Sequence, residues 1–242
     1  FGVNGTMTFE EAIAVNESDL IERLQEYINN RPEFDPNTTD LILIDIESEL
    51  HPKGIGKYND DPVNLSLFIE AIKLRINVTR RVLPNADLSL WAVTAPLANG
   101  GITDSFLNDT EALIKAGQQG MFDELDYITP RLFVNFGPTD LGYQFTEQYV
   151  RTGVEWSNFT KSDNVTFMPL APLSSFTIFK DSPNHANEII DPVTARLIVD
   201  TLQEYNEVKM ILHWTGKTSN LNISEFYQNN MIVPCDCFSQ YL

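Results

Sequence analysis

Short apolar runs alternate with helical patterns along the 242 residues, and this alternation limits the fold more than any other feature. Buried strands of parallel sheets have such short, continuous apolar stretches. The runs cover Leu41 to Ser48, Asp87 to Pro96, Tyr127 to Phe136, Val165 to Ala171 and Val208 to Thr215. In the third run we expect the strand to begin after Pro130. Since helical patterns separate the runs, the sequence predicts an α/β fold with a parallel sheet.

Between these runs, apolar residues recur at helical spacing. The predicted helices span Asp19 to Asn30, Val63 to Val82, Asp104 to Gly117, Tyr143 to Trp156, Asp191 to Asn206 and Asn222 to Asn229. Ser18 is expected to cap the first helix. In the third helix Leu107, Leu113 and Ile114 are expected to face inward. The segment Gly54-Ile55-Gly56 lacks the third glycine of a phosphate-binding fingerprint, so we interpret it as a flexible loop.

Long loops follow the strands, whereas the turns before the strands are mostly shorter. The loops are His51 to Pro62, Leu97 to Thr103, Gly137 to Gly142 and Pro172 to Asn187. In α/β folds, loops at the carboxyl ends of parallel strands carry the functional site. The site is therefore expected at that end of the sheet.

The chain carries 16 basic and 34 acidic residues, which gives a formal net charge of -18. Such a surface repels phosphate backbones and anionic lipid, so neither nucleic acid nor an anionic membrane is an expected partner. An acidic polysaccharide is disfavoured for the same reason. The sequence contains no apolar stretch long enough to span a membrane. It implies no cofactor, and three histidines and two cysteines offer no metal-site pattern.

Nine N-x-[ST] sequons point to a secreted or extracellular glycoprotein, because composition alone would give roughly three or four. They begin at Asn4, Asn16, Asn37, Asn64, Asn77, Asn108, Asn158, Asn164 and Asn222. Phe1 is preceded by no secretory leader, so we expect a mature product or part of a longer chain. Cys235 and Cys237 are too close for an unstrained mutual disulfide; each pairs with another segment or chain, or stays free.

Two carboxylates follow the first apolar run. Alternation along a strand puts Asp45 and Glu47 on one face and Ile46 on the other. Two such carboxylates repel when both are ionised, so one is expected to hold a proton near neutral pH, as a general acid must. The alternative is a solvated acidic pair at a strand end, which the polar Glu49 and the following loop favour.

The segment from Asp40 to Glu47, DLILIDIE, resembles the fourth-strand signature DGxDxDxE of glycoside hydrolase family 18. Leu41 and Leu43 replace the usual Gly and middle Asp. The later segments resemble, in order, strands five to eight of plant class III chitinases of the hevamine type. These segments are Leu88 to Pro96, Gly120 to Phe136, Val165 to Pro172 and Met210 to Trp214. The similarity extends from about Asp19 to Thr215.

The resemblance implies a chemistry for these residues. Glu47 would protonate the glycosidic oxygen, and the substrate's own acetamido oxygen would attack the anomeric carbon. Asp45 would orient the acetamido group and tune Glu47. Trp214 would stack on the sugar and Asn135 would bond it, although both residue types also fit ordinary strand ends. The family's sixth-strand tyrosine has no counterpart among Phe136, Gly137 and Pro138.

The resemblance also implies a fold. The chain is expected to be a single domain, 1–242, of a parallel (β/α) barrel of TIM type that lacks its first strands. Five strands cannot close an eight-stranded barrel, so a companion polypeptide or self-association is expected to complete it. The expected function is a secreted chitinase-like hydrolase of β-1,4-linked N-acetylglucosamine. Two alternatives are an inactive glycan-binding or structural coat or filament protein, and an unrelated α/β domain.

Overall fold

The structure is a computed structural model of the whole chain. It describes residues 7–31, 35–37, 41–46, 49–91, 104–129, 139–160, 166–167, 170–172, 192–206, 208 and 212–214. The statements below concern these residues.

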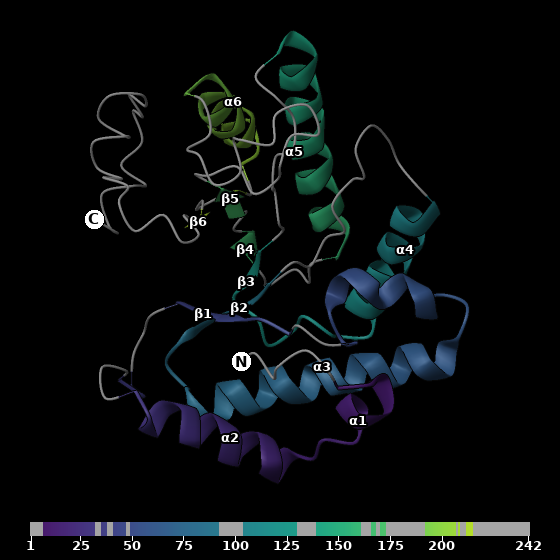
Figure 1. Cartoon of the computed structure of the whole chain (residues 1–242), viewed down its shortest axis with the longest axis vertical. Coiled ribbons are helices and arrows are strands. Elements are labelled where there is room, and N and C mark those ends of the chain that lie inside the picture. Colours follow the sequence, from purple (N-terminus) through teal and green to yellow (C-terminus); the bar gives the residue numbers. More distant parts are fainter. Residues whose placement is uncertain are drawn as a thin grey trace.

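The strands form two parallel sheets, which confirms the predicted strand direction (Figure 1). One sheet has the order β1 (Leu41–Ile44), β2 (Asp87–Trp91), β3 (Tyr127–Thr129), β4 (Thr166–Phe167). The other pairs β5 (Leu170–Pro172) with β6 (Leu212–Trp214). Neighbouring strands in the first sheet are also consecutive in the sequence, as in a (β/α) barrel. The described strands do not close into a full barrel.

Most of the predicted helices are confirmed to within a few residues. The helices are α1 (Phe9–Ile13), α2 (Glu17–Asn29), the 3-10 helix η1 (Pro52–Tyr58), α3 (Pro62–Val82), α4 (Asp104–Gln118), α5 (Asp140–Thr160) and α6 (Pro192–Gln203). Asn16, not Ser18, caps α2, because the Asn16 side chain accepts a hydrogen bond from the backbone of Asp19. Helix α1 was not predicted, and the helix expected at Asn222 to Asn229 lies outside the described residues.

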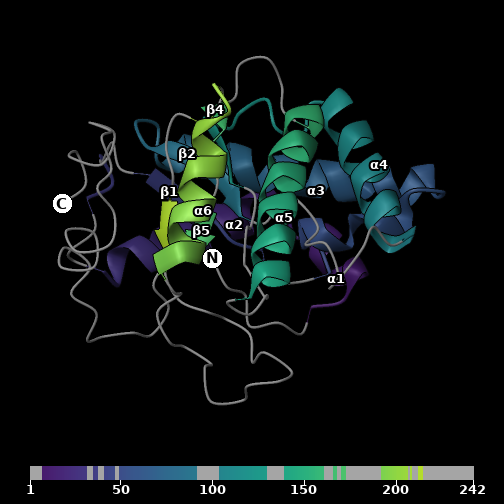
Figure 2. The same ribbon diagram turned by 90° about the horizontal axis from the view of Figure 1, so that it is seen from above.

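The strands lie between α1, α2 and α3 on one side and the pair α5 and α6 on the other (Figures 1 and 2). Both views show α5 and α6 side by side. Arg151 of α5 joins them by donating hydrogen bonds to Glu204, just after α6, at 2.6 and 2.9 Å. One core cluster joins β1, β2 and β3 to α3, α4 and η1. Its apolar side chains position the sheet against the helices that follow each strand.

The segment interpreted as a flexible loop is instead a packed 3-10 helix. Ile55 is fully buried, and the backbone N–H of Gly56 donates to Asp109 Oδ1 of α4 at 2.8 Å. A Cβ on Gly56 would lie 2.4 Å from the Asp109 backbone nitrogen, so only glycine fits this approach. The glycines therefore allow close packing of η1 on α4 and do not indicate flexibility.

Two other local predictions are wrong. The third strand includes Tyr127–Thr129 and so begins before Pro130, because it pairs with β2 from Ser89 onward. Leu107 is 45% exposed at the start of α4, whereas Leu113 is buried as expected and Ile114 is half-buried. Asp109 occupies an inward position of this helix instead and accepts the hydrogen bond from η1.

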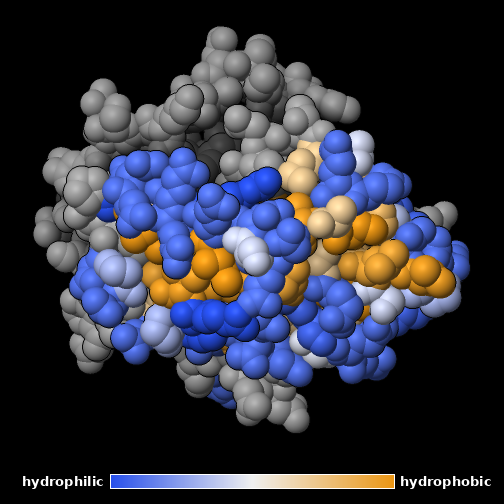
Figure 3. Space-filling view, turned by 90° about the horizontal axis from the view of Figure 1, so that it is seen from below, coloured by the Kyte–Doolittle hydropathy of each residue, from blue (hydrophilic) through white to orange (hydrophobic). Residues whose placement is uncertain are grey.

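Figure 3 shows the face that α1, α2 and α3 form, where hydrophilic residues surround a band of hydrophobic ones. On α3, Val63 is 68% exposed and Leu67 is 42% exposed. None of the described helices combines the length and apolarity that a membrane crossing requires.

Candidate functional site

The strands of the first sheet have two chemically different faces. The outer face carries Ile44, Leu88, Leu90 and Ile128, which are all buried in the core cluster with the helices. Alternation places Leu43, Ser89 and Thr129 on the opposite, inner face. The outer face is uniformly apolar, whereas the inner face carries polar groups. Chemistry in this sheet is therefore confined to the inner face.

Asp45 lies at the carboxyl end of this inner face, directly after β1. It is half-buried, and its Oδ1 atom is shielded from solvent. Ile44 and Ile46 on either side belong to the core cluster, so Asp45 points away from the helices. The burial of Ile44 and Ile46 agrees with the predicted alternation, and the role of Asp45 stays a prediction. A carboxylate at this position can accept hydrogen bonds from a ligand bound over the strand ends.

Sequence analysis missed a buried hydroxyl pair on the same face. The hydroxyls of Ser89 on β2 and Thr129 on β3 share a hydrogen bond, and both side chains are fully buried. Ser89 is in register with Leu43, so it lies one inward position below Asp45. The only sequence signal was a small hydroxyl residue at alternate positions of otherwise apolar runs. The pair fixes β2 against β3 beneath the strand ends.

Three of the predicted sugar-contacting and catalytic side chains lie outside the described residues. Neither Glu47 nor Asn135 is described, and for Trp214 the structure describes the backbone alone. Trp214 ends β6, where it is in register with Pro172 of β5. Its strand therefore ends at a carboxyl edge, as the prediction requires. The catalytic pair and the sugar contacts stay predictions.

The sequons that the structure describes lie mostly on exposed positions. Asn16, Asn37, Asn77 and Asn108 are exposed, and Asn64 is half-buried. Asn158 lies in α5, while Asn4, Asn164 and Asn222 fall outside the described residues, as do Cys235 and Cys237. No cluster of three metal-ligating side chains occurs in the described part of the chain. Glycosylation at each sequon stays a prediction.

Shifted pKa values in the described ranges belong to groups on or beside the helices. Burial, with a smaller effect of Arg23, lowers the pKa of Arg75, whose guanidinium donates to backbone carbonyls of Ala71 and Ala12. A hydrogen bond from Lys115 is the main cause that lowers the pKa of Glu111. Arg75 joins α3 to α1, and the Glu111–Lys115 pair lies within α4, so both shifts arise from contacts of the helices.

No protein-family model matches the sequence, and no curated protein matches it. Solved structures do match. The monoclinic crystal structure of bee venom hyaluronidase aligns with a TM-score of 0.61 at 10% identity, over 91% of this chain and 78% of the hyaluronidase. The same enzyme in complex with a hyaluronic acid tetramer gives 0.59 at 10% identity, over 91% and 76%. This chain has a glycosidase-like fold.

The glycosidase-like fold confirms the sequence resemblance to glycoside hydrolases at the level of the fold. The matching structures are of a TIM-barrel hyaluronidase, so they support the glycosidase architecture and not the chitinase family in particular. At 10% identity the likeness concerns the fold alone. In TIM-barrel enzymes the active site is at the carboxyl ends of the strands. Asp45 is at that end of β1, which makes it the central residue of the candidate site.

Proposed function

We propose that this protein is a secreted glycoside hydrolase that cleaves β-1,4-linked N-acetylglucosamine polymers by substrate-assisted acid catalysis. The observation that carries the proposal is the position of Asp45 on the inner face, at the carboxyl end of a strand in a glycosidase-like fold. A catalytic carboxylate in a barrel enzyme occupies this kind of position. The segment DIE that contains Asp45 supplies a second carboxylate two residues later.

In this mechanism Glu47 is the general acid. The alternation of the sequence predicts that Glu47 shares the face of Asp45. Glu47 donates its proton to the glycosidic oxygen as the bond to the anomeric carbon breaks. The acetamido oxygen of the substrate forms the new bond to that carbon, so the enzyme needs no nucleophile of its own. Water then attacks the anomeric carbon, the bond from this carbon to the acetamido oxygen breaks, and the Glu47 carboxylate takes a proton from the water, which restores the acid.

Asp45 positions the reacting group. Its carboxylate accepts the acetamido N–H, which aligns the acetamido oxygen with the anomeric carbon and balances the positive charge that develops there. The buried Ser89–Thr129 pair below supports the strand ends from which Asp45 projects. Trp214 and Asn135 are the proposed sugar contacts, through stacking and hydrogen bonding.

Charge favours a neutral substrate over the hyaluronic acid that is bound in the bee venom structure. The net charge of -18 repels a polyanion at long range, and every approach of such a substrate carries this cost. Chitooligosaccharides have the acetamido group that the mechanism requires and no charge. We therefore expect turnover of chitooligosaccharides in preference to hyaluronan, with any hyaluronan activity rising as salt is added.

The test compares three single variants on both substrates. Glu47→Gln removes the acid and is expected to lower kcat by on the order of a hundredfold or more. Asp45→Asn is expected to lower kcat by a similar factor. Glu49→Gln is the matched control, because Glu49 is an exposed carboxylate that pairs with Lys57. The proposal fails if Glu47→Gln and Glu49→Gln retain equal activity, or if only hyaluronan is cleaved.

An inactive glycan-binding or structural extracellular glycoprotein is the second candidate. The observation that favours it is the segment Phe136-Gly137-Pro138, which lacks the tyrosine hydroxyl expected at the acetamido oxygen. Loss of such a donor costs about a hundredfold or more in rate. Titration calorimetry with chitooligosaccharides distinguishes the candidates, because binding without turnover in the wild type identifies an inactive glycan-binding protein. Absence of both binding and turnover excludes the hydrolase and the chitooligosaccharide-binding protein, and leaves the structural role.

The proposal also includes how the chain assembles. A companion polypeptide or a second copy would complete the barrel, and domain 1–242 would be one part of it. Cys235 or Cys237 could join the chains. Intact mass and gel mobility with and without reductant test this point. A single species at the mass of one chain in both conditions would refute a disulfide-linked companion.

A further inference from the structure

A polar cavity of about 440 Å³ lies between α3 and the turn that joins α4 to β3. It is lined by Lys73, Ile76, Asn77, Gln118, Gln119, Gly120, Met121, Asp123 and Glu124. Residues 118–124 directly precede β3, so the cavity is at the amino ends of the strands, opposite Asp45. It is therefore separate from the candidate catalytic site. Its volume falls within the range of about 300–1,000 Å³ typical of small-ligand sites.

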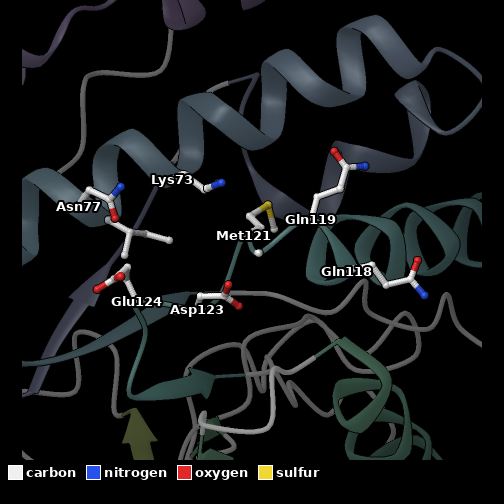
Figure 4. A pocket seen from close by; sticks show the side chains of 9 residues that line it. Lys73, Asn77, Gln118, Gln119, Met121, Asp123 and Glu124 are labelled. Carbon is white, nitrogen blue, oxygen red and sulfur yellow. The ribbon is translucent and has the colours of Figure 1, made fainter.

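The cavity has the chemistry of a sugar site. Gln118 and Gln119 supply amide donors and acceptors, and Asp123 and Glu124 supply acceptors. Met121 and Ile76 are both 1% exposed and give the cavity an apolar floor. A sugar ring needs both kinds of surface, since its hydroxyls bond polar groups while its C–H faces and acetamido methyl pack on apolar ones. Figure 4 shows the glutamines at one end of the cavity and Met121 near its middle.

The turn that forms one wall is well fixed. Gly120 has φ of 76°, and a Cβ there would meet Asp123 Oδ2 at 2.7 Å, so this position requires glycine. Arg80 of α3 donates to the Glu124 carbonyl at 3.1 Å and to Asp126 at 2.5 Å. These bonds hold the turn against α3 on the far side of the cavity. The backbone of this wall is thus held in place before a ligand arrives, which lowers the cost of binding.

A sequon lies on the rim of this cavity. Asn77 lines the cavity, is exposed, and begins the sequence Asn77-Val78-Thr79. Figure 4 shows Asn77 at the end of the cavity near Lys73 and Glu124. We propose that the cavity is the binding site for the first sugars of an N-linked glycan attached to Asn77 of the same chain.

The covalent step is the ordinary one of the secretory pathway. Asn77 Nδ2 forms a bond to C1 of the first N-acetylglucosamine, the amide loses one proton, and the lipid diphosphate donor leaves with the electrons of its broken C1–O bond. In the fold Thr79 is only 3% exposed, and its hydroxyl donates to the Arg75 carbonyl at 2.8 Å. The transferase cannot reach this threonine in the folded helix. The transfer therefore precedes the folding of α3.

Because the glycan is covalently attached, the cavity can hold it with only a weak affinity for sugars. A ligand tethered beside its site has an effective concentration in the millimolar range, so contacts too weak to capture a free sugar still hold it. Two hydrogen bonds from the cavity wall correspond to roughly tenfold in the equilibrium between bound and free glycan. A glycan bound in this way covers the turn before β3, and it becomes part of the folded structure.

The test uses the full chain secreted from a eukaryotic host. Glycopeptide mass spectrometry measures which sequons are occupied. A time course with peptide N-glycosidase on the native protein then measures how fast each glycan is released. We expect Asn77 to be occupied, and its glycan to be released roughly tenfold more slowly than the glycan on Asn108, an exposed sequon outside the cavity.

Variants distinguish two causes of slow glycan release at Asn77: binding of the glycan in the cavity, and poor access of the glycosidase to a helix. The double change Gln119→Ala and Glu124→Ala removes two polar wall groups, and it should raise the release rate at Asn77 while the rate at Asn108 stays the same. Asn108→Gln is the matched control and should leave release at Asn77 unchanged. The proposal is overturned if Asn77 carries no glycan, if its glycan is released as fast as that on Asn108, or if the double change has no effect.

Discussion

Replacing Gly56 by alanine tests whether η1 is a packed element of the fold. A Cβ at this position would lie 2.4 Å from both the backbone nitrogen and the Oδ1 atom of Asp109, and 2.8 Å from the Asn108 carbonyl carbon. Two of these atoms belong to the backbone of α4 and cannot rotate away. Either η1 must move off α4, or α4 must shift.

The cost follows from what the movement breaks. The Gly56 N–H donates to the buried Asp109 carboxylate at 2.8 Å, and a hydrogen bond to a charged acceptor contributes about 1.5–3 kcal/mol. Forcing a methyl group into a packed contact costs about 1–3 kcal/mol more. Partial relaxation offsets some of this, so we expect Gly56→Ala to lower the free energy of unfolding by about 3 kcal/mol.

Gly54 provides the matched control, two residues away in the same 3-10 helix. A Cβ there meets nothing within 4 Å. Gly54→Ala is therefore expected to be neutral or to stabilise by up to about 1 kcal/mol, because alanine restricts the unfolded chain. Urea unfolding followed by circular dichroism measures both variants. Equal free energies of unfolding for Gly56→Ala and the wild type would show that η1 does not pack on α4 as described.

Two further predictions concern the inner face and the α4 surface. Ser89→Ala and Thr129→Val should each lower the free energy of unfolding by about 1–3 kcal/mol, because each leaves one buried hydroxyl without a partner. The double variant should lose much less than the sum, and additive losses in urea unfolding would contradict this. Because a hydrogen bond from Lys115 lowers the Glu111 pKa below its ordinary 4.5, this carboxylate stabilises the fold above about pH 4.5, and the contribution is lost as the pH falls through the lower folded pKa. Glu111→Gln should then be less stable than the wild type at pH 7, and the difference should shrink as the pH falls below 4.5; a difference that stays constant with pH would refute this.

Sequence patterns predicted the parallel sheet and most helix bounds well, because both depend on periodic burial. The pattern fails where a tertiary contact decides the conformation. Gly54 and Gly56 indicate a flexible loop by propensity alone, but Asp109, some fifty residues later, makes that segment a packed helix. Leu107 fits a helical stripe, yet the inward positions of α4 near its start are Asp109 and Thr110. A buried acid bonded to a distant backbone has no signature in local periodicity.

At the candidate site the predictable part is orientation. Alternation predicts Asp45 opposite Ile46, and the burial of Ile46 in the core cluster confirms the part of this prediction that concerns Ile46. The Ser89–Thr129 pair was not predicted, since serine and threonine in a strand also occur on solvated faces. Ser89 lies opposite Tyr127 and Thr129 lies opposite Trp91, so the two hydroxyls meet diagonally across β2 and β3.

The two faces of the sheet also explain how a TM-score of 0.61 is compatible with 10% identity. The outer face needs only apolar side chains of suitable size, as at Ile44, Leu90 and Ile128, and many sequences meet that requirement. The inner face at the strand ends is not constrained by helix packing, so the residues there determine whether the fold binds, cleaves or does neither. Substitutions on the outer face should change the free energy of unfolding, and those at Asp45 and Glu47 should change catalysis. In the proposed mechanism, function therefore depends on the chemistry of Asp45 and Glu47 and not on the likeness of the backbone.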